Sequence, residues 1–226
     1  SDTSTKFSVV EITARAMKFD SLRVNQNFND SYSCALHWYS KSQGEPAQFV
    51  KIKDMSLNNC IVGLLFGQFD GTPVQDAPQS ENSITHFNTR GCQSPIYFNQ
   101  SNGFLFLGES TINSLRNEWE INNPGVYSYE DSRALIMRQG ALLVSNGELL
   151  KTDTQLGYGV EIWGGEIKIS NQSVEIASPN YKIHGGRIKI QNATSYMSNA
   201  AADYVEIEPD AEGSFVSSNC EFKKPA

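Results

Sequence analysis

The sequence has little positive charge, few cysteines and histidines, and no long hydrophobic run. Its 226 residues carry 18 Lys and Arg against 25 Asp and Glu, a net charge of -7. Nucleic acids and anionic membranes reward basic patches, so this balance argues against either as a partner. The longest apolar run, residues 61–66, is far shorter than the roughly 20 residues that a membrane-spanning helix needs. Residues 1–20 contain no run suited to a signal peptide.

Cysteines and histidines are too scattered to indicate a disulfide framework or a metal centre. There are four cysteines, with no Cys-x-x-Cys pair: Cys34, Cys60, Cys92 and Cys220. Four cysteines permit three pairings and the sequence favours none, so we expect buried free thiols. The three histidines, His37, His86 and His184, are isolated from the cysteines. We therefore expect no metal site and no cofactor.

What the sequence does contain is a short repeat in its C-terminal half. Residues 160–171 are VEIWGGEIKISN and residues 181–192 are YKIHGGRIKIQN, which are identical at seven of twelve positions with an offset of 21. A shorter version, GALLVSN, precedes them at residues 140–146. The shared pattern is Gly-x-(Leu/Ile)-x-(Val/Ile)-(Ser/Gln)-Asn, and a repeat of this length indicates a stacked architecture.

Each part of the repeat has a structural reason. Ile167 and Ile169 alternate with polar residues, which is the period of a strand with one buried face. The glycine pairs at 164–165 and 185–186 permit the positive φ angles of a tight corner. Asn171 ends the strand, where Asn tolerates the left-handed conformation and can bond the equivalent Asn one rung away.

The repeat predicts three short strands and three corners per turn, over residues 160–163, 166–170 and 173–177. A leucine-rich repeat of similar length would require Leu-x-x-Leu-x-Leu, which is missing. We therefore predict an all-β fold, a right-handed single-stranded parallel β-helix. Its interior would hold two columns, one of Leu142, Ile167 and Ile188, the other of Val144, Ile169 and Ile190.

The same register predicts which outward side chains meet. Glu161 would lie beside Lys182, and Glu166 beside Arg187, as exposed ion pairs about 4.8 Å apart along the stack. Each such pair contributes about 1 kcal/mol or less. Near the N-terminus, residues 34–39 alternate in the same manner. There we expect Cys34, Leu36 and Trp38 in the core, with His37 and Tyr39 exposed.

Upstream of the repeat, apolar segments predict further strands at irregular spacing: residues 50–53, 61–69, 84–87, 96–98 and 104–107. Insertions are expected at 68–82 and 118–131. We divide the chain into an N-terminal cap or first coil (1–49), a parallel β-helix with loop insertions (50–202), and a C-terminal cap or oligomer contact (203–226).

These coils resemble the pectate-lyase-like β-helices, and most of all the tailspike and tail-fibre proteins of bacteriophages. The resemblance is close over residues 134–198 and looser over 50–133, and it rests on Gly and Asn corners. It implies a virion (tail) or extracellular protein, usually a homotrimer, that recognises bacterial surface polysaccharide. Two alternatives stay open: a polysaccharide depolymerase (glycoside hydrolase or lyase) of the same fold, and a non-catalytic trimeric shaft or adhesin stalk.

The catalytic motifs of the wider superfamily are not present in recognisable form. Residues 88–90 (NTR) and 184–186 (HGG) match the polygalacturonase motifs only in part and lack their carboxylates. Phage depolymerases share no single motif, so the sequence leaves open whether the protein is an enzyme.

The sharpest local feature is Glu118-Trp119-Glu120. On a strand, Glu118 and Glu120 would share a face with α-carbons about 6.5 to 7 Å apart, close to the separation of a glycosidase acid and base. Trp119 in a loop would stack on a sugar ring. The simpler interpretation is a solvated acidic strand with its Trp in the core.

A second group of aromatic and acidic residues follows closely: Tyr127, Tyr129, Glu130 and Asp131. Aromatic rings beside acids suit a carbohydrate-binding groove, and they equally suit a subunit interface. The sequence thus predicts carbohydrate binding by Trp119 and these four residues, with Glu118 and Glu120 as the catalytic candidates.

Overall fold

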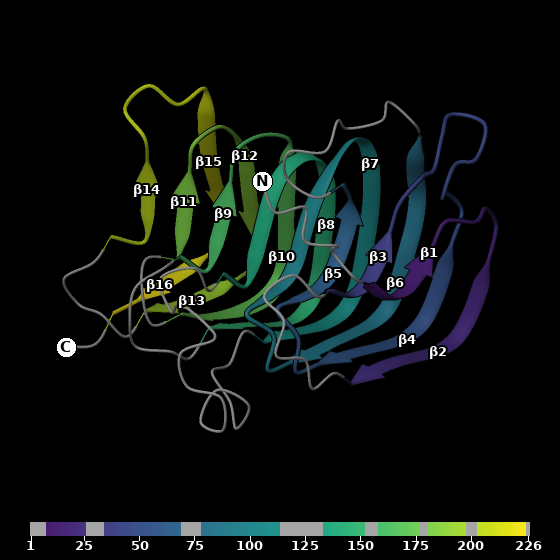
Figure 1. Cartoon of the computed structure of the whole chain (residues 1–226). Coiled ribbons are helices and arrows are strands. Elements are labelled where there is room, and N and C mark those ends of the chain that lie inside the picture. The colour runs from purple at the N-terminus through teal and green to yellow at the C-terminus, as the bar shows by residue number, and fades with distance from the viewer. Residues whose placement is uncertain are drawn as a thin grey trace, which may run out of the picture.

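The computed structural model describes residues 8–25, 34–68, 78–113, 133–151, 158–176, 180–197 and 203–224. Within these ranges the regular structure is all β, in sixteen strands joined into one sheet (Figure 1). Every pairing between these strands is parallel. The all-β class and the large parallel sheet predicted from the repeat are therefore confirmed.

The chain passes repeatedly through the same ladders of paired strands, from the purple N-terminal end to the yellow C-terminal end of Figure 1. The first ladder contains β1 (Ser8–Ile12), β3 (Cys34–Trp38), β5 (Val62–Gly67), the start of β7 (Ser94–Asn113), the start of β8 (Leu135–Lys151), β9 (Val160–Ile162), β11 (Tyr181–Ile183) and β14 (Val205–Ile207). The second contains β2 (Lys18–Asn25), β4 (Lys51–Asn58), β6 (Gln79–Arg90), the rest of β7 and β8, β10 (Glu166–Ile176), β12 (Gly186–Gln191) and β15 (Gly213–Ser218). Two further strands, β13 (Thr194–Met197) and β16 (Glu221–Lys223), extend the ladder at the end of β10.

The core consists of apolar columns that run along the stack. Leu142, Ile167 and Ile188 are paired in register and are at most 1% exposed, so the first predicted interior column is confirmed. It continues to Leu105 on one side and to Phe215 on the other. The second predicted column is also confirmed, with members Val144, Ile169 and Ile190. Alternation along each strand produces these columns, because every second side chain points inward.

A ladder of asparagines bends the chain in the C-terminal half. Its members have positive φ angles: Asn146 (55°), Asn171 (53°), Asn192 (51°) and Asn219 (52°). Each side-chain amide donates to the amide oxygen of the preceding member, at 3.1 Å, 3.2 Å and 2.7 Å in chain order. The prediction that Asn146, Asn171 and Asn192 occupy equivalent corners is confirmed. β10 nevertheless continues through Asn171 as one strand, where we had predicted two.

The glycine pairs of the repeat form the other corner. Gly186 has a φ of 76°, and a Cβ added to it would lie 2.7 Å from the carbonyl carbon of Gly164. The two glycine corners are therefore stacked directly on each other, and their close approach leaves no room for a side chain. The aligned register of the repeat is confirmed by this contact.

Towards the N-terminus, other residues take the place of the asparagine ladder. Pairing of β2, β4, β6 and β7 aligns Ser21, Asp54, His86 and Glu109. The constant offset between β7 and β8 around this point aligns Glu109 with Asn146. None of these four side chains stands on a residue with positive φ. We call Ser21, Asp54, His86 and Glu109 the acidic column.

Two expectations about residues 34–82 need correction. Cys34, Leu36 and Trp38 are fully buried as predicted, but His37 is only 8% exposed. Its Nε2 lies 2.8 Å from the carbonyl oxygen of Gly67, and its ring stacks on Tyr39 with centroids 4.1 Å apart. Residues 79–82 belong to β6 rather than to an insertion.

Candidate functional site

The seven residues that the sequence suggested for a site lie outside the described residues. They are Glu118, Trp119, Glu120, Tyr127, Tyr129, Glu130 and Asp131, all between residues 113 and 133. Their roles stay predictions. The described part of the chain offers two other concentrations of polar side chains, a groove in the N-terminal half and a network in the C-terminal half.

The groove has a volume of about 1160 Å³ and lies over β2, β4, β6, β7 and the bend in β8. Three columns of outward side chains line it. The first is the acidic column. The second, which we call the middle column, contains Arg23, Ser56, Asn88, Thr111 and Glu148. The third contains Asn25, Asn58 and Arg90.

Strand alternation builds the groove floor. In β4, Asp54, Ser56 and Asn58 point outward, whereas Met55 and Leu57 are at most 2% exposed. Parallel pairing repeats this arrangement on each neighbouring strand at about 4.8 Å. The groove therefore presents polar groups on a rigid lattice that is anchored by the core beneath it.

His86 is the centre of the acidic column. Its Nδ1 lies 2.7 Å from Oδ1 of Asp54, and its Nε2 lies 3.5 Å from Oε2 of Glu109. A carboxylate only accepts, so Nδ1 of His86 donates to Asp54 and the second nitrogen is directed towards Glu109. The His86 and Asp54 side chains are 45% and 47% exposed, so a ligand in the groove can reach them.

The arrangement is not a serine nucleophile with its base. Ser21 pairs with Asp54, and His86 lies on the far side of Asp54. Ser21 is therefore two rungs from His86, at about 10 Å, which is beyond hydrogen-bonding reach. What the column can supply is a histidine oriented by one carboxylate, with a second carboxylate beside it, as in general acid–base catalysis.

The middle column is neutral at its centre and charged at its ends. Arg23 stands at one end and Glu148 at the other, with Ser56, Asn88 and Thr111 between them. Hydroxyl and amide groups both donate and accept hydrogen bonds, so they match the hydroxyls of a sugar without requiring charge. The strip is suited to a neutral or weakly charged polyhydroxyl ligand.

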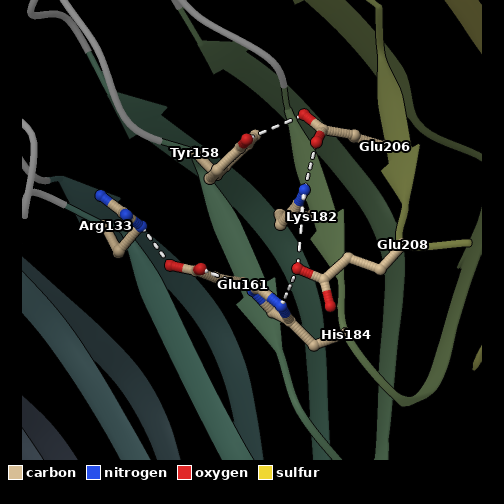
Figure 2. A network of polar contacts seen from close by, with 7 residues as sticks. All are labelled: Arg133, Tyr158, Glu161, Lys182, His184, Glu206 and Glu208. Atoms are coloured by element: carbon tan, nitrogen blue, oxygen red, sulfur yellow. Dashed lines mark hydrogen bonds and ion pairs between the residues drawn. The ribbon is translucent and has the colours of Figure 1, made fainter. Parts of the chain in front are cut away.

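The polar network of the C-terminal half lies on the outward side of β9, β11 and β14 (Figure 2). Glu161 contacts Arg133 and accepts from Nε2 of His184 at 2.8 Å. Nδ1 of His184 lies 2.6 Å from Glu208. Lys182 contacts Glu206, which also accepts from the Tyr158 hydroxyl at 2.8 Å.

These contacts correct the expected ion pairs. Glu161 is aligned with Lys182 as predicted, but its partners are Arg133 and His184, and it is only 6% exposed. Lys182 instead contacts Glu206 on the next strand. The alignment fixes the backbones, whereas these long side chains reach partners one rung or two residues away.

The second expected pair is also wrong in its partner. Glu166 is aligned with Arg187, yet its carboxylate lies 2.6 Å from Nζ of Lys189 and 3.5 Å from Nζ of Lys168. The hydrogen bond with Lys189 lowers the pKa of Glu166. Arg187 donates from Nε to the Ser214 hydroxyl.

Electrostatics in the network follow from these pairings. The hydrogen bond from Lys182, supported by Tyr158, lowers the pKa of Glu206. Burial opposes the charge on Lys182, but contact with Glu206 outweighs it and raises the pKa of that amine. Burial and the carboxylate of Glu206 raise the pKa of the Tyr158 phenol. Each charged group thus already has a partner within the network.

Trp163, beside the network, has both ring faces covered. The His184 ring stacks on it with centroids 4.3 Å apart, and Cζ of Arg138 lies 3.6 Å from its centroid. A sugar-binding platform needs one free aromatic face. The network and its tryptophan are therefore a closed set of structural contacts, and the groove is the better candidate site.

The signal for the groove is present in the sequence but weak. The four strands contribute SLRVN (21–25), DMSLN (54–58), HFNTR (86–90) and ESTIN (109–113). Each has a polar or charged residue at the first, third and fifth positions. We missed this because the segments share almost no identities and are separated by 33, 32 and 23 residues, unlike the regular C-terminal repeat.

Among the described residues, no group of three or more His, Cys, Asp or Glu side chains is arranged to hold a metal ion. The same ranges contain no helix that is long and apolar enough to cross a membrane. Comparisons of the chain with known protein families, with curated proteins and with solved structures found no match.

Proposed function

We propose that the protein is a right-handed parallel β-helix of the phage tailspike kind, and that its groove binds an extended surface polysaccharide. The helical path is supported by the recurring order of strands in each pass and by the stacked glycine and asparagine corners. Right-handedness is the rule for parallel strands that are connected through a crossover in one sheet.

The observation that carries the binding function is the middle column of the groove. Ser56, Asn88 and Thr111 stand on successive rungs about 4.8 Å apart, which is close to the length of one pyranose unit in an extended glycan. Each sugar along the groove would therefore meet one hydrogen-bonding side chain. The core-anchored floor keeps these groups preorganised, which lowers the entropic cost of binding.

The test is a binding measurement with a panel of capsular and O-antigen polysaccharides. Asn88→Ala should weaken binding of the recognised glycan about tenfold, since it removes one amide that both donates and accepts. Glu208→Gln, in the network outside the groove, is the matched control and should bind normally. Equal affinities for Asn88→Ala and the unaltered protein would place the glycan elsewhere, with Trp119 and its neighbours as the next candidates.

A depolymerase is the second candidate, and the acidic column favours it. His86 lies between Asp54 and Glu109 beside the proposed glycan path, so the column offers an acid and a base on one side of the chain of sugars. Turnover would appear as new reducing ends for a hydrolase or unsaturated products for a lyase. His86→Gln should then abolish turnover and retain binding, whereas a pure binder shows no products before or after the substitution.

The tailspike resemblance further suggests three copies side by side in a virion tail or at a cell exterior. Apolar side chains are exposed towards the C-terminal end: Tyr196 (39%), Ile207 (45%), Val216 (49%) and Phe222 (38%). A trimer contact would cover such side chains. Light scattering that shows a stable monomer at micromolar concentration would remove the trimer from the proposal and leave the groove intact.

A further inference from the structure

Two cysteines meet at equivalent corners of neighbouring passes. Cys60 lies between β4 and β5, and Cys92 lies between β6 and β7. The backbone nitrogen of Gln93 donates to the carbonyl oxygen of Cys60 at 3.0 Å, so the two corners are adjacent rungs of the stack. The Sγ atoms are 2.8 Å apart, and both residues are 1% exposed.

We infer that Cys60 and Cys92 form a disulfide when the chain folds under oxidising conditions. A disulfide needs sulfur atoms about 2.05 Å apart and α-carbons within about 4.4 to 6.8 Å. Adjacent rungs at about 4.8 Å meet the second condition. The sulfur atoms already lie closer than ordinary non-bonded contact, and closure requires a shift of less than about 1 Å. No backbone movement is needed.

The chemistry is thiol–disulfide exchange with a small disulfide such as glutathione disulfide. The thiolate of one cysteine attacks the oxidant, forms a mixed disulfide and releases one glutathione thiolate. The second cysteine then attacks the protein sulfur of that mixed disulfide and releases the other glutathione. Two protein thiols lose their protons and two electrons, and one glutathione disulfide becomes two glutathione thiols, so the step balances.

Burial determines when the exchange takes place. Loss of solvation, together with the hydrogen bond from Cys92, raises the pKa of the Cys60 thiol. A buried thiol that is seldom ionised reacts slowly with an oxidant in solution. The exchange therefore belongs to the folding chain, before the two corners close, and the folded core then protects the product from reduction.

The bond would fix one edge of the groove. Asn59 and Arg90, which both line the groove, are joined by a hydrogen bond from the Asn59 nitrogen to the Arg90 oxygen at 2.9 Å. They immediately precede the Cys60 and Cys92 corners. A covalent tie at this point would hold the β4 and β6 rungs in register without any contribution from a bound ligand.

The experiment compares protein refolded in a glutathione redox buffer with protein refolded in a reducing agent. Free thiols are alkylated in denaturant and the digests are examined by mass spectrometry. After oxidative refolding we expect two alkylated cysteines and one linked peptide pair, joining Cys60 to Cys92. Cys220→Ala should keep this linkage, and Cys92→Ala should lose it. The midpoint of thermal unfolding should rise by about 5 to 10 °C on oxidation.

Four alkylated cysteines after oxidative refolding would overturn the inference. So would a linked pair that contains Cys34 or Cys220 in place of either proposed partner. Peptide mapping of the unaltered chain decides the question even if a cysteine variant fails to fold. Neither result bears on glycan binding, which is measured separately.

Discussion

The two halves of the molecule treat the same position of the stack differently. In the C-terminal half the position is occupied by Asn146, Asn171, Asn192 and Asn219, whose amides bond to one another and whose φ angles are positive. In the N-terminal half it is occupied by the acidic column, without positive φ. One ladder satisfies its own hydrogen bonds, and the other leaves side chains directed into a groove.

This difference separates a structural device from a candidate site within a single architecture. Asparagine is suited to the left-handed conformation and can both donate and accept along a ladder. Asp54, His86 and Glu109 instead present charge and a titratable ring where the chain does not need a left-handed bend. The comparison predicts that substitutions in the two ladders act on different quantities, stability in one and binding in the other.

The largest effect should come from the core, where the halves are alike. Ile188→Asn places an amide in a fully buried apolar column and should lower the free energy of unfolding by about 4 kcal/mol. Ile84→Asn, beneath the groove, should cost a similar amount because Ile84 is equally buried. Lys189→Asn, on the outward side of the Ile188 strand, is the control and should cost about 1 kcal/mol or less. Urea denaturation measures all three, and a mild effect at Ile188 would show that the column is loosely packed.

The asparagine ladder should be the next most sensitive position. Asn171→Val puts a β-branched residue at a φ of 53° and removes two amide contacts, so we expect a loss of about 2 kcal/mol. Asn171→Gly keeps the backbone conformation accessible and should cost less. Asp54→Val in the acidic column should also cost less, about 0.5 kcal/mol, since its backbone is extended. Equal losses at Asn171 and Asp54 would abolish the distinction between the halves.

The C-terminal architecture was predictable because its signals are local and repeated. Alternating Ile167 and Ile169, the paired glycines and the terminal Asn171 each fix one strand, corner or bend. Copying them at an offset of 21 fixed the register, including Ile167 against Ile188. Side-chain partners were not predictable in this way. Glu166 selects Lys189 over Arg187 by reach and rotamer, which the strand alignment does not determine.

A smaller, pH-dependent effect should appear in the Figure 2 network. The hydrogen bond from Lys182 lowers the pKa of Glu206, so the folded protein holds this carboxylate ionised more strongly than the unfolded chain does. Its contribution is therefore present above the unfolded pKa of about 4.3 and is lost as the pH falls through the lower folded value. Glu206 is 46% exposed, so solvent screening limits the contribution to about 0.5 kcal/mol at pH 7.

The measurement is the difference in unfolding free energy between the unaltered protein and Glu206→Gln as a function of pH. The difference should be constant near neutrality and should shrink towards zero as the pH falls below about 4. A difference that grows on acidification would show that the Lys182–Glu206 contact does not stabilise the fold.

The smallest effect on stability should come from His86→Asn. His86 is 45% exposed and its backbone does not require asparagine, so the free energy of unfolding should change by less than about 0.5 kcal/mol. Glycan binding or turnover should nevertheless fall, because the bridge between Asp54 and Glu109 is removed. Thermal unfolding and glycan titration of the same sample test both statements, and a loss above about 2 kcal/mol would make the acidic column structural.

The groove could not be predicted from the sequence in the way the repeat was. Its residues come from four strands, and pairing alone brings them together. Asp54 and His86 are 32 residues apart, and His86 and Glu109 are 23 residues apart. Only the weak alternation of polar residues in each strand points to them. The residues that did attract notice, Glu118 to Asp131, were conspicuous by composition, and their roles stay predictions.

The chain length of a pass is not tied to the register of its strands. Leu105 and Leu142 are neighbours across 37 residues, and Ile167 and Ile188 are neighbours across 21. Insertions and deletions at corners can therefore accumulate in evolution while the interior columns stay aligned. The same property makes the corners suitable grafting points, where a foreign binding loop could be displayed from a backbone whose strand order it does not alter.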